Sequence, residues 1–194
     1  MERMARGDGW IGCECTEQVR ALKRIYSSIH AGEKAMQYWL MKTEPSEFSL
    51  EDLKRAPKQT APWDGVRNYQ ARNHMRDGMK LGDRILFYHS STDPTAIVGT
   101  ATVAREAYPD DSAWDRKSEY FDKRSTPERP VWVRVDVKFE SEFAVPLTLA
   151  ELRTIPELKD MVLLRKGMRL SVQPVTSSEF NAILAHAGKL AKHM

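Results

Sequence analysis

The stretch RILFYHSSTDPTAIVGTATVA, residues 84–104, decides the fold class of this sequence. Its two apolar runs, 84–89 and 96–104, flank the connection Ser-Ser-Thr-Asp-Pro-Thr, which is rich in turn-forming residues. Short apolar runs that are bounded by turn residues are typical of neighbouring strands, so this stretch predicts a β-hairpin. The sequence on either side adds further strands and short helices to this hairpin.

Strands and helices do not alternate strictly along the rest of the chain. Further strands are expected at 38–42, 131–139 and 169–175. Helices are expected from Ser49 to Pro57, at 68–80, 149–154 and 157–161, and from Ser177 or Ser178 onward. This order predicts an α+β fold with a curved or barrel-like sheet and disfavours a doubly wound parallel sheet.

Two apolar patterns predict parts of the core. Within the run 131–139, one face would carry Val131, Val133, Val135, Val137 and Phe139. Within the helix 68–80, Ala71, Met75 and Met79 recur with the spacing of one helical face. Both faces are expected to be buried.

Composition is typical of a globular protein with a sizeable core. Of the 194 residues, 41% are hydrophobic and 29% charged, and no apolar run reaches the roughly 18 to 20 residues that cross a bilayer. Residues 36–188 are expected to form one domain, followed by a C-terminal tail at 189–194. Residues 1–35 are either an ordinary N-terminal helix or an extension upstream of an authentic start at Met36, and we interpret them as an extension.

The charge balance argues against strong binding along a phosphate backbone. Thirty Lys and Arg residues oppose 27 Asp and Glu residues, which leaves a net charge of only +3. We therefore expect any contact with nucleic acid to be local. The two cysteines, Cys13 and Cys15, supply neither a zinc-ligand set nor a disulfide framework. Together with the absence of a secretory signal, they predict a cytoplasmic protein.

Sequence motifs for catalysis, phosphate cradles and metal binding are missing. The sequence contains no G-x-G-x-x-G, G-x-x-x-x-G-K-[ST], H-E-x-x-H or G-x-S-x-G, and its five histidines are scattered. We therefore expect no catalytic residue, no metal site and no cofactor.

Aromatic, amide and arginine residues concentrate in the segment WDGVRNYQARN, residues 63–73. A flat heteroaromatic ring can stack on Trp63 or Tyr69, and an amide such as that of Asn68 can hydrogen-bond its edge. Arg67 and Arg72 are candidates for phosphate contacts, because the planar guanidinium fork matches phosphate oxygens. In the alternative interpretation, Trp63 and Tyr69 are core anchors beside a capped helix.

Four linked motifs resemble an EVE domain. They are YWLMKTEP at 38–45, WDGVRNYQARN at 63–73, GDRILFYHS at 82–90 and RLSVQP at 169–174, and the resemblance runs in this order from about Met36 to Gly188. It implies a PUA-like fold, a curved mixed β-sheet or pseudo-barrel with surrounding short helices, related to the YTH domains that read methylated adenine in RNA. Members of the family, including the thymocyte nuclear protein group, are thought to bind modified bases in DNA or RNA without doing chemistry. The resemblance thus implies a non-catalytic binding module whose partner is nucleic acid and not a membrane.

The resemblance also implies which residues form the pocket. The candidates for binding the base are Thr43, Trp63, Val66, Asn68, Tyr69, Tyr88, His89, Ser90, Ser171, Val172 and Gln173. The candidates for the rim and for phosphate contacts are Lys42, Arg67, Arg72 and Arg169. Trp63 is the expected stacking wall, so an indole sealed in the interior with no opening beside it would exclude this hypothesis.

Two further functions are open at this point. ASCH-type domains are also PUA-like, and some act as amidohydrolases on acylated cytidine with Lys, Thr and Glu, the residue types present as Lys42, Thr43 and Glu44. On a regular strand Lys42 and Thr43 point to opposite faces, which argues against Lys42 as the base that activates a Thr43 nucleophile. The third possibility is a protein-interaction module.

Overall fold

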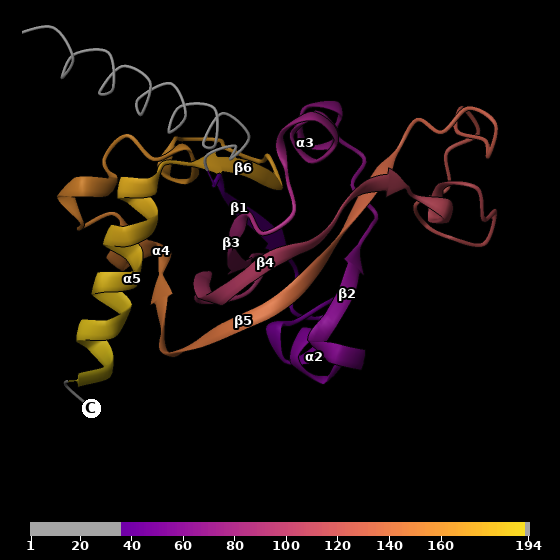
Figure 1. The fold of residues 1–194 in the computed structure, drawn as a ribbon. Helices are drawn as coiled ribbons and strands as arrows, with labels where there is room; N and C mark the ends of the chain where they lie inside the picture. Colours follow the sequence, from indigo (N-terminus) through magenta and orange to yellow (C-terminus); the bar gives the residue numbers. More distant parts are fainter. Residues whose placement is uncertain (1–35, 193–194) are drawn as a thin grey trace, which may run out of the picture. The chain divides into compact units, whose positions relative to one another are not determined.

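The computed structural model describes residues 36–192. Its six strands are β1 (Tyr38–Thr43), β2 (Thr60–Trp63), β3 (Arg84–His89), β4 (Ala96–Pro109), β5 (Val133–Thr148) and β6 (Val172–Val175). They form one sheet in the order β2-β5-β4-β3-β1-β6, in which only β1 and β3 pair in parallel. The α+β fold is therefore confirmed. The sheet is curved but not closed, because β2 and β6 are its two edges (Figure 1).

Short helices surround the sheet as expected. The α-helices are α2 (Leu50–Arg55), α3 (Tyr69–Asn73), α4 (Leu149–Leu152) and α5 (Ser177–Lys192), and α3 continues into a π-helical turn, η2 (His74–Gly78). The 3-10 turns are η1 (Pro57–Gln59), η3 (Asp111–Ala113), η4 (Pro156–Leu158) and η5 (Val162–Leu164). The prediction of a helix at 157–161 is therefore wrong, since the structure has only the 3-10 turn η4 there. Helix α5 runs past the boundary predicted at Gly188, and the expectations for residues 1–35 lie outside the described residues.

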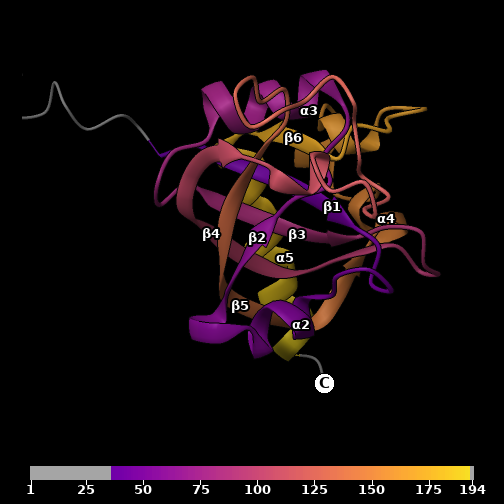
Figure 2. The same ribbon diagram turned by 90° about the vertical axis from the view of Figure 1, so that its right-hand side faces the viewer.

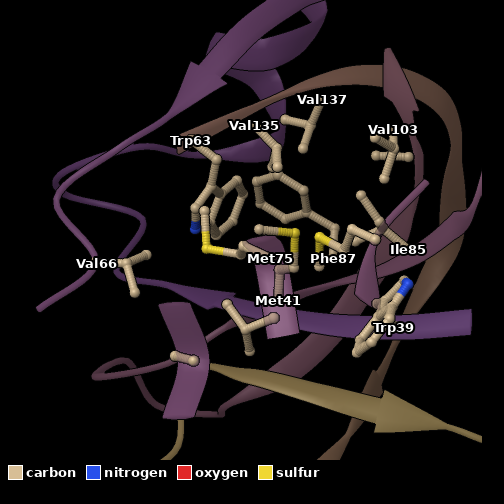
Figure 3. Packing of buried hydrophobic residues seen from close by; sticks show 14 of the residues in the cluster. Trp39, Met41, Trp63, Val66, Met75, Ile85, Phe87, Val103, Val135 and Val137 are labelled. Atoms are coloured by element: carbon tan, nitrogen blue, oxygen red, sulfur yellow. The ribbon is translucent and has the colours of Figure 1, made fainter. Parts of the chain in front are cut away.

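Both faces of the sheet are buried, which explains the continuous apolar runs in β1 and β3. Trp39, Met41 and Phe87 point to one face, where they pack with Met75 of η2 (Figure 3). Leu40 and its neighbours on the other face pack against α5, which lies behind the strands in Figure 2. Because side chains alternate along a strand, one sequence run supplies both clusters.

β5 is longer than predicted and bends where it meets β4. The register between the two strands shifts at several points, one of them at Gly99. A Cβ atom at Gly99 would lie 2.3 Å from the carbonyl oxygen of Ser141, so only glycine permits this close approach. Such bulges bend a strand and increase its twist. Val135 and Val137 are fully buried, and Val133 and Phe139 are partly buried against the same core, so this part of the predicted core face is confirmed. Val131 lies ahead of the strand, which begins at Val133.

Candidate functional site

A cavity of about 530 Å³ opens where β1 ends. We call it the Trp63 cavity, and it is lined by Lys42, Thr43, Glu44, Glu47, Phe48, Pro62, Trp63, Asp64, Gly65, Val66, Arg67, Asn68, Tyr120 and Ser171. Its volume lies within the range of about 300–1,000 Å³ that is usual for small-molecule sites. β1 stops at Thr43, ahead of Pro45, so side chains on both sides of the strand end reach the cavity.

Trp63 forms the inner wall of the cavity and also belongs to the core. Its indole contacts the rings of Phe48 and Phe87 edge-on, with ring centroids 6.1 and 5.3 Å away, and Figure 3 shows it beside Phe87. The residue is only 6% exposed, yet it lines the cavity. The indole is therefore not sealed, and both interpretations of Trp63 hold together.

Tyr120 also lines the cavity, which the sequence did not reveal. Its ring lies over Gly65, so closely that a Cβ atom at this glycine would be 2.8–2.9 Å from the ring carbons. Gly65 also has a φ of +71°, a conformation that favours glycine. Its amide donates to the buried Asp110 at 3.2 Å, which ties the Trp63 loop to the connection between β4 and β5.

Arg67 braces the same two segments and does not serve as a free phosphate ligand. Its guanidinium donates to Asp110 at 2.7 Å, to Ser112 at 3.0 Å and to the carbonyls of Tyr120 and Val66 at 2.7 and 3.2 Å. Burial alone would raise the pKa of Asp110, but hydrogen bonds from Ser112 and Arg67 and the charge of Arg67 lower it below its usual value. Four of its five N–H donors are engaged within the protein, so this geometry argues against the prediction that Arg67 takes phosphates.

Asn68 presents an amide donor to the Trp63 cavity. Its side-chain oxygen caps α3 by accepting from the amides of Gln70 and Ala71 at 2.9 and 3.0 Å. The cap fixes the oxygen on the helix, and the Nδ2 amine donates to no other described residue. The role of Asn68 as an edge donor stays a prediction, which this free amine permits.

Carboxylates are the main acceptors in the Trp63 cavity. The Glu47 carboxylate makes no hydrogen bond or ion pair with any residue in the described part of the chain. Burial raises the pKa of Asp64, and the neighbouring charge of Asp110 raises it further, although Arg134 opposes both effects. Neither acidic side chain was among the predicted site residues, because single carboxylates in polar loops carry no pattern.

A second cavity, of about 360 Å³, lies on the other side of Lys42. We call it the basic cavity, and it is lined by Lys42, Tyr88, Ser90, Thr95, Leu149, Arg153, Leu163, Arg165, Lys166, Gly167, Met168 and Arg169. Lys42 lines both cavities, and its ammonium donates to the carbonyl of Met168 at 3.2 Å. Burial lowers the pKa of this lysine. Tyr88, Ser90 and Arg169 therefore line the basic cavity and not the predicted base pocket.

Five other predicted pocket residues line neither cavity. Tyr69 is 48% exposed and lies against Trp132 and Arg72, whose guanidinium donates to the carbonyl of Val131. His89 accepts a hydrogen bond from the amide of Leu50 at 3.2 Å. Val172 and Gln173 are buried in β6, where the Gln173 amide donates to Leu170. The placement of these five residues in the pocket is therefore wrong. The position of a residue in a motif does not reveal on which face of a strand or helix its side chain lies.

Residues 36–192 contain no group of His, Cys, Asp and Glu side chains that could hold a metal ion. No helix within this range has the length and apolar character needed to cross a membrane.

Comparison with known proteins places the chain in a family. The EVE domain family model matches residues 37–186. Thymocyte nuclear protein 1 from Mus musculus is 43% identical over 173 residues, which cover 80% of this chain and 76% of the mouse protein. A hypothetical protein from Leishmania major has a TM-score of 0.76 and 49% identity, and the match covers 80% of this chain and 97% of that one.

A further solved structure contains a ligand. It is human THYN1 protein in complex with 5-methylcytosine-containing DNA, with a TM-score of 0.73 and 42% identity over 78% of this chain and 97% of that one. The resemblance carried by the four sequence motifs is thus confirmed by both sequence and structure. Because the family match spans 37–186 and the relatives exceed 40% identity, the chain belongs to the EVE domain family.

Proposed function

We propose that this protein is a non-catalytic binding module that recognises a modified nucleobase in the Trp63 cavity. The observation that carries the proposal is an open cavity that both Trp63 and Tyr120 line, with Asn68 among the other lining residues. Its volume of about 530 Å³ accommodates a nucleoside. The human relative solved with 5-methylcytosine-containing DNA supports the ligand class and makes 5-methylcytosine the first base to test.

The polar groups of the cavity suit a base with an exocyclic amine. A carboxylate accepts from the cytosine amino group, and Glu47 and Asp64 both line the cavity. The Asn68 amine can donate to a ring nitrogen or carbonyl of the same base. Thymine and uracil lack this amine, so the carboxylates would meet their carbonyl oxygens and repel them.

Magnitudes limit what a methyl group alone can contribute. Stacking is worth roughly 1–3 kcal/mol per base, whereas burial of one methyl group contributes only about 0.8 kcal/mol. A base extruded from a duplex also costs a few kcal/mol of stacking and pairing. We therefore infer that selectivity depends on the fit of the cavity and on hydrogen bonds that the wrong base leaves unpaired.

Hydrogen bonds at the end of β1 support a binding role over amidohydrolase activity. The Thr43 hydroxyl donates to the carbonyl of Phe48 at 3.0 Å, and the Lys42 ammonium donates to that of Met168. A nucleophilic threonine needs an adjacent base that takes its proton. Incubation with N4-acylated cytidine should give no turnover. Turnover that Thr43→Ala abolishes would overturn the non-catalytic assignment.

Asn68 provides the sharpest test of binding. Asn68→Asp keeps the oxygen that caps α3 but replaces the amide donor by a carboxylate, whereas Asn68→Ala also removes the cap. In fluorescence anisotropy with an oligonucleotide that contains 5-methylcytosine, we expect Asn68→Asp to bind on the order of tenfold more weakly than wild type at unchanged melting temperature, because the lost donor leaves the base edge unpaired. Asn181→Asp, on the exposed surface of α5, is the charge-matched control. Equal affinity of Asn68→Asp and wild type for this oligonucleotide would contradict the proposal.

The cytoplasmic location stays a prediction. It rests on the presence of only two cysteines in the chain. Fractionation of cells that express the full chain tests it, and recovery of the protein in a nuclear or organellar fraction would contradict it.

A further inference from the structure

The two cavities that meet at Lys42 differ in charge. The Trp63 cavity is lined by three carboxylates, those of Glu44, Glu47 and Asp64, against the cations of Lys42 and Arg67. The basic cavity is lined by five cations and by no carboxylate. The cations are Lys42, Arg153, Arg165, Lys166 and Arg169. A net charge of only +3 for the chain makes this local concentration unusual.

The cations of the basic cavity are uncompensated. Elsewhere in the described residues, arginines such as Arg84 and Arg134 pair with carboxylates at 2.9 and 2.6 Å. Within residues 36–192, none of the four exposed cations of the basic cavity forms an ion pair or donates a side-chain hydrogen bond. Their charge and their donors are available to a ligand.

The loop that carries three of these cations is fixed in place. Residues 165–168 form a tight turn in which the Met168 amide donates to the Arg165 carbonyl at 3.2 Å, and Gly167 takes a φ of +75°. The Lys42 ammonium holds the Met168 carbonyl at 3.2 Å. The turn therefore holds the backbone that carries Arg165, Lys166 and Arg169 beside the end of β1.

We propose that the basic cavity binds a phosphate of the nucleic acid backbone next to the base that occupies the Trp63 cavity. This inference rests on the proposed function. A base in a polymer carries phosphates on both sides, and the carboxylates of the Trp63 cavity repel them. Lys42 lines both cavities, so the basic cavity adjoins the bound base, and its arginine forks match phosphate oxygens.

Removal of the three turn cations tests this assignment. The variant is Arg165→Gln/Lys166→Gln/Arg169→Gln, and its control, Lys138→Gln/Lys189→Gln/Lys192→Gln, removes three exposed charges elsewhere. Binding of an oligonucleotide with one 5-methylcytosine is measured by anisotropy between about 50 and 200 mM salt, and binding of free 5-methyl-2′-deoxycytidine by calorimetry. The free nucleoside carries no phosphate, so it occupies the Trp63 cavity alone.

We expect the turn variant to bind the oligonucleotide on the order of tenfold more weakly. The magnitude of its logarithmic salt slope should fall by about 1, because one phosphate contact contributes about 0.7–0.9. Its affinity for the free nucleoside and its preference for methylated over plain oligonucleotide should match those of wild type. Arg169→Lys, which keeps the charge, should retain more affinity than Arg169→Gln.

The outcomes separate this inference from the proposed function. If wild type does not prefer the methylated oligonucleotide over the plain one, the base-binding role is refuted. The difference in salt slope between the turn variant and wild type reports on the phosphate site. An unchanged slope in the turn variant, or an equal loss in the control variant, overturns the phosphate assignment. A free anion shares this chemistry. If inorganic phosphate binds wild type but not the turn variant while oligonucleotide affinity stays equal, the ligand is a free anion and the backbone assignment is overturned.

Discussion

Trp63 shows how one side chain can support both the core and the cavity. Its indole is 6% exposed and packs edge-on against Phe48 and Phe87. Trp63→Ala removes these contacts, so we expect the free energy of unfolding to fall by roughly 3–5 kcal/mol. Urea denaturation followed by circular dichroism measures the loss. Trp63→Phe, which keeps an aromatic ring, should lose less, and an unchanged midpoint for Trp63→Ala would show that the packing contributes little.

This double role changes what Trp63→Ala can show about binding. From the sequence, a wall residue would lose ligand while the protein stays folded, and a core anchor would lose stability. The indole both lines the cavity and packs in the core, so a weaker affinity of Trp63→Ala could follow from partial unfolding. Asn68→Asp separates the two effects, because it keeps the α3 cap.

Individual residues of the site differ in how far the sequence could predict them. Trp63 and Asn68 were found because aromatic and amide groups crowd around a turn. Tyr120 was missed, since its connection has no hydrophobic period and only three-dimensional packing brings it over Gly65. Arg67 was assigned to phosphate because its true partner, Asp110, lies 43 positions further along the chain. Long-range ion pairs leave no trace in local sequence.

The start of helix α2 depends on a neutral histidine. The amide of Leu50 donates to Nε2 of His89, and protonation of this nitrogen would remove the acceptor. Burial lowers the pKa of His89 from its usual value of 6.5. The unfolded chain therefore binds more protons below about pH 6.5, so the free energy of unfolding should fall as the pH drops below this value.

Denaturant titrations between pH 8 and 5 check this pH dependence. His89→Gln offers a neutral side chain that can accept the same hydrogen bond, so its stability should depend less on pH than that of wild type. Part of the dependence will persist, because burial also lowers the pKa of His74. The His89 assignment fails if both proteins lose stability equally in this range.

The bend between β4 and β5 depends on Gly99. In Gly99→Ala the new Cβ would lie 2.3 Å from the Ser141 carbonyl oxygen and 2.7 Å from a Leu50 methyl group. We expect a loss of about 3 kcal/mol, because backbone must move to relieve this overpacking. Gly188→Ala is the matched control, with no atom within 4 Å of the new group, and should stabilise α5 by about 0.5–1 kcal/mol. Thermal denaturation of both variants tests whether the bulge tolerates a side chain.

Strands and helices were predictable where their sequence shows a single hydrophobic periodicity. β1, β3 and β6 and the helix after Ser49 appear close to their expected places. The end of β5 was missed because its polar residues break the alternation, and β2 because it is short and contains Pro62, which an edge strand tolerates. The π-helical turn after α3 has no sequence signal that distinguishes it from a regular helix.

The near balance of charge over the whole chain limits its affinity for plain DNA. With a net charge of +3 and one local basic cavity, few counterions are released on binding. We expect dissociation constants weaker than about 1 μM for unmodified DNA at physiological salt. Anisotropy with an unmodified duplex and single strand measures them. Submicromolar binding of either would show that the protein binds the backbone generally and that base recognition is secondary.

The architecture could be predicted further than the site. Continuous apolar runs and hairpin turns indicated an α+β fold, and two-sided burial of the sheet now explains those runs. Closure of the sheet was not predictable, because it depends on where edge strands end and not on their composition. The division of the predicted pocket into two cavities required coordinates, since both adjoin the same strand end at Lys42.

The attachment of Tyr120 to the connection 110–132, and of Trp63 to the sheet, has an evolutionary consequence. Loops tolerate insertions and substitutions that a packed sheet does not. Exchange of the middle of this connection between relatives, with Asp110 and its hydrogen bonds to Gly65 and Arg67 kept, can therefore alter which ligands fit while the fold persists, much as antibodies vary their recognition loops on a constant framework.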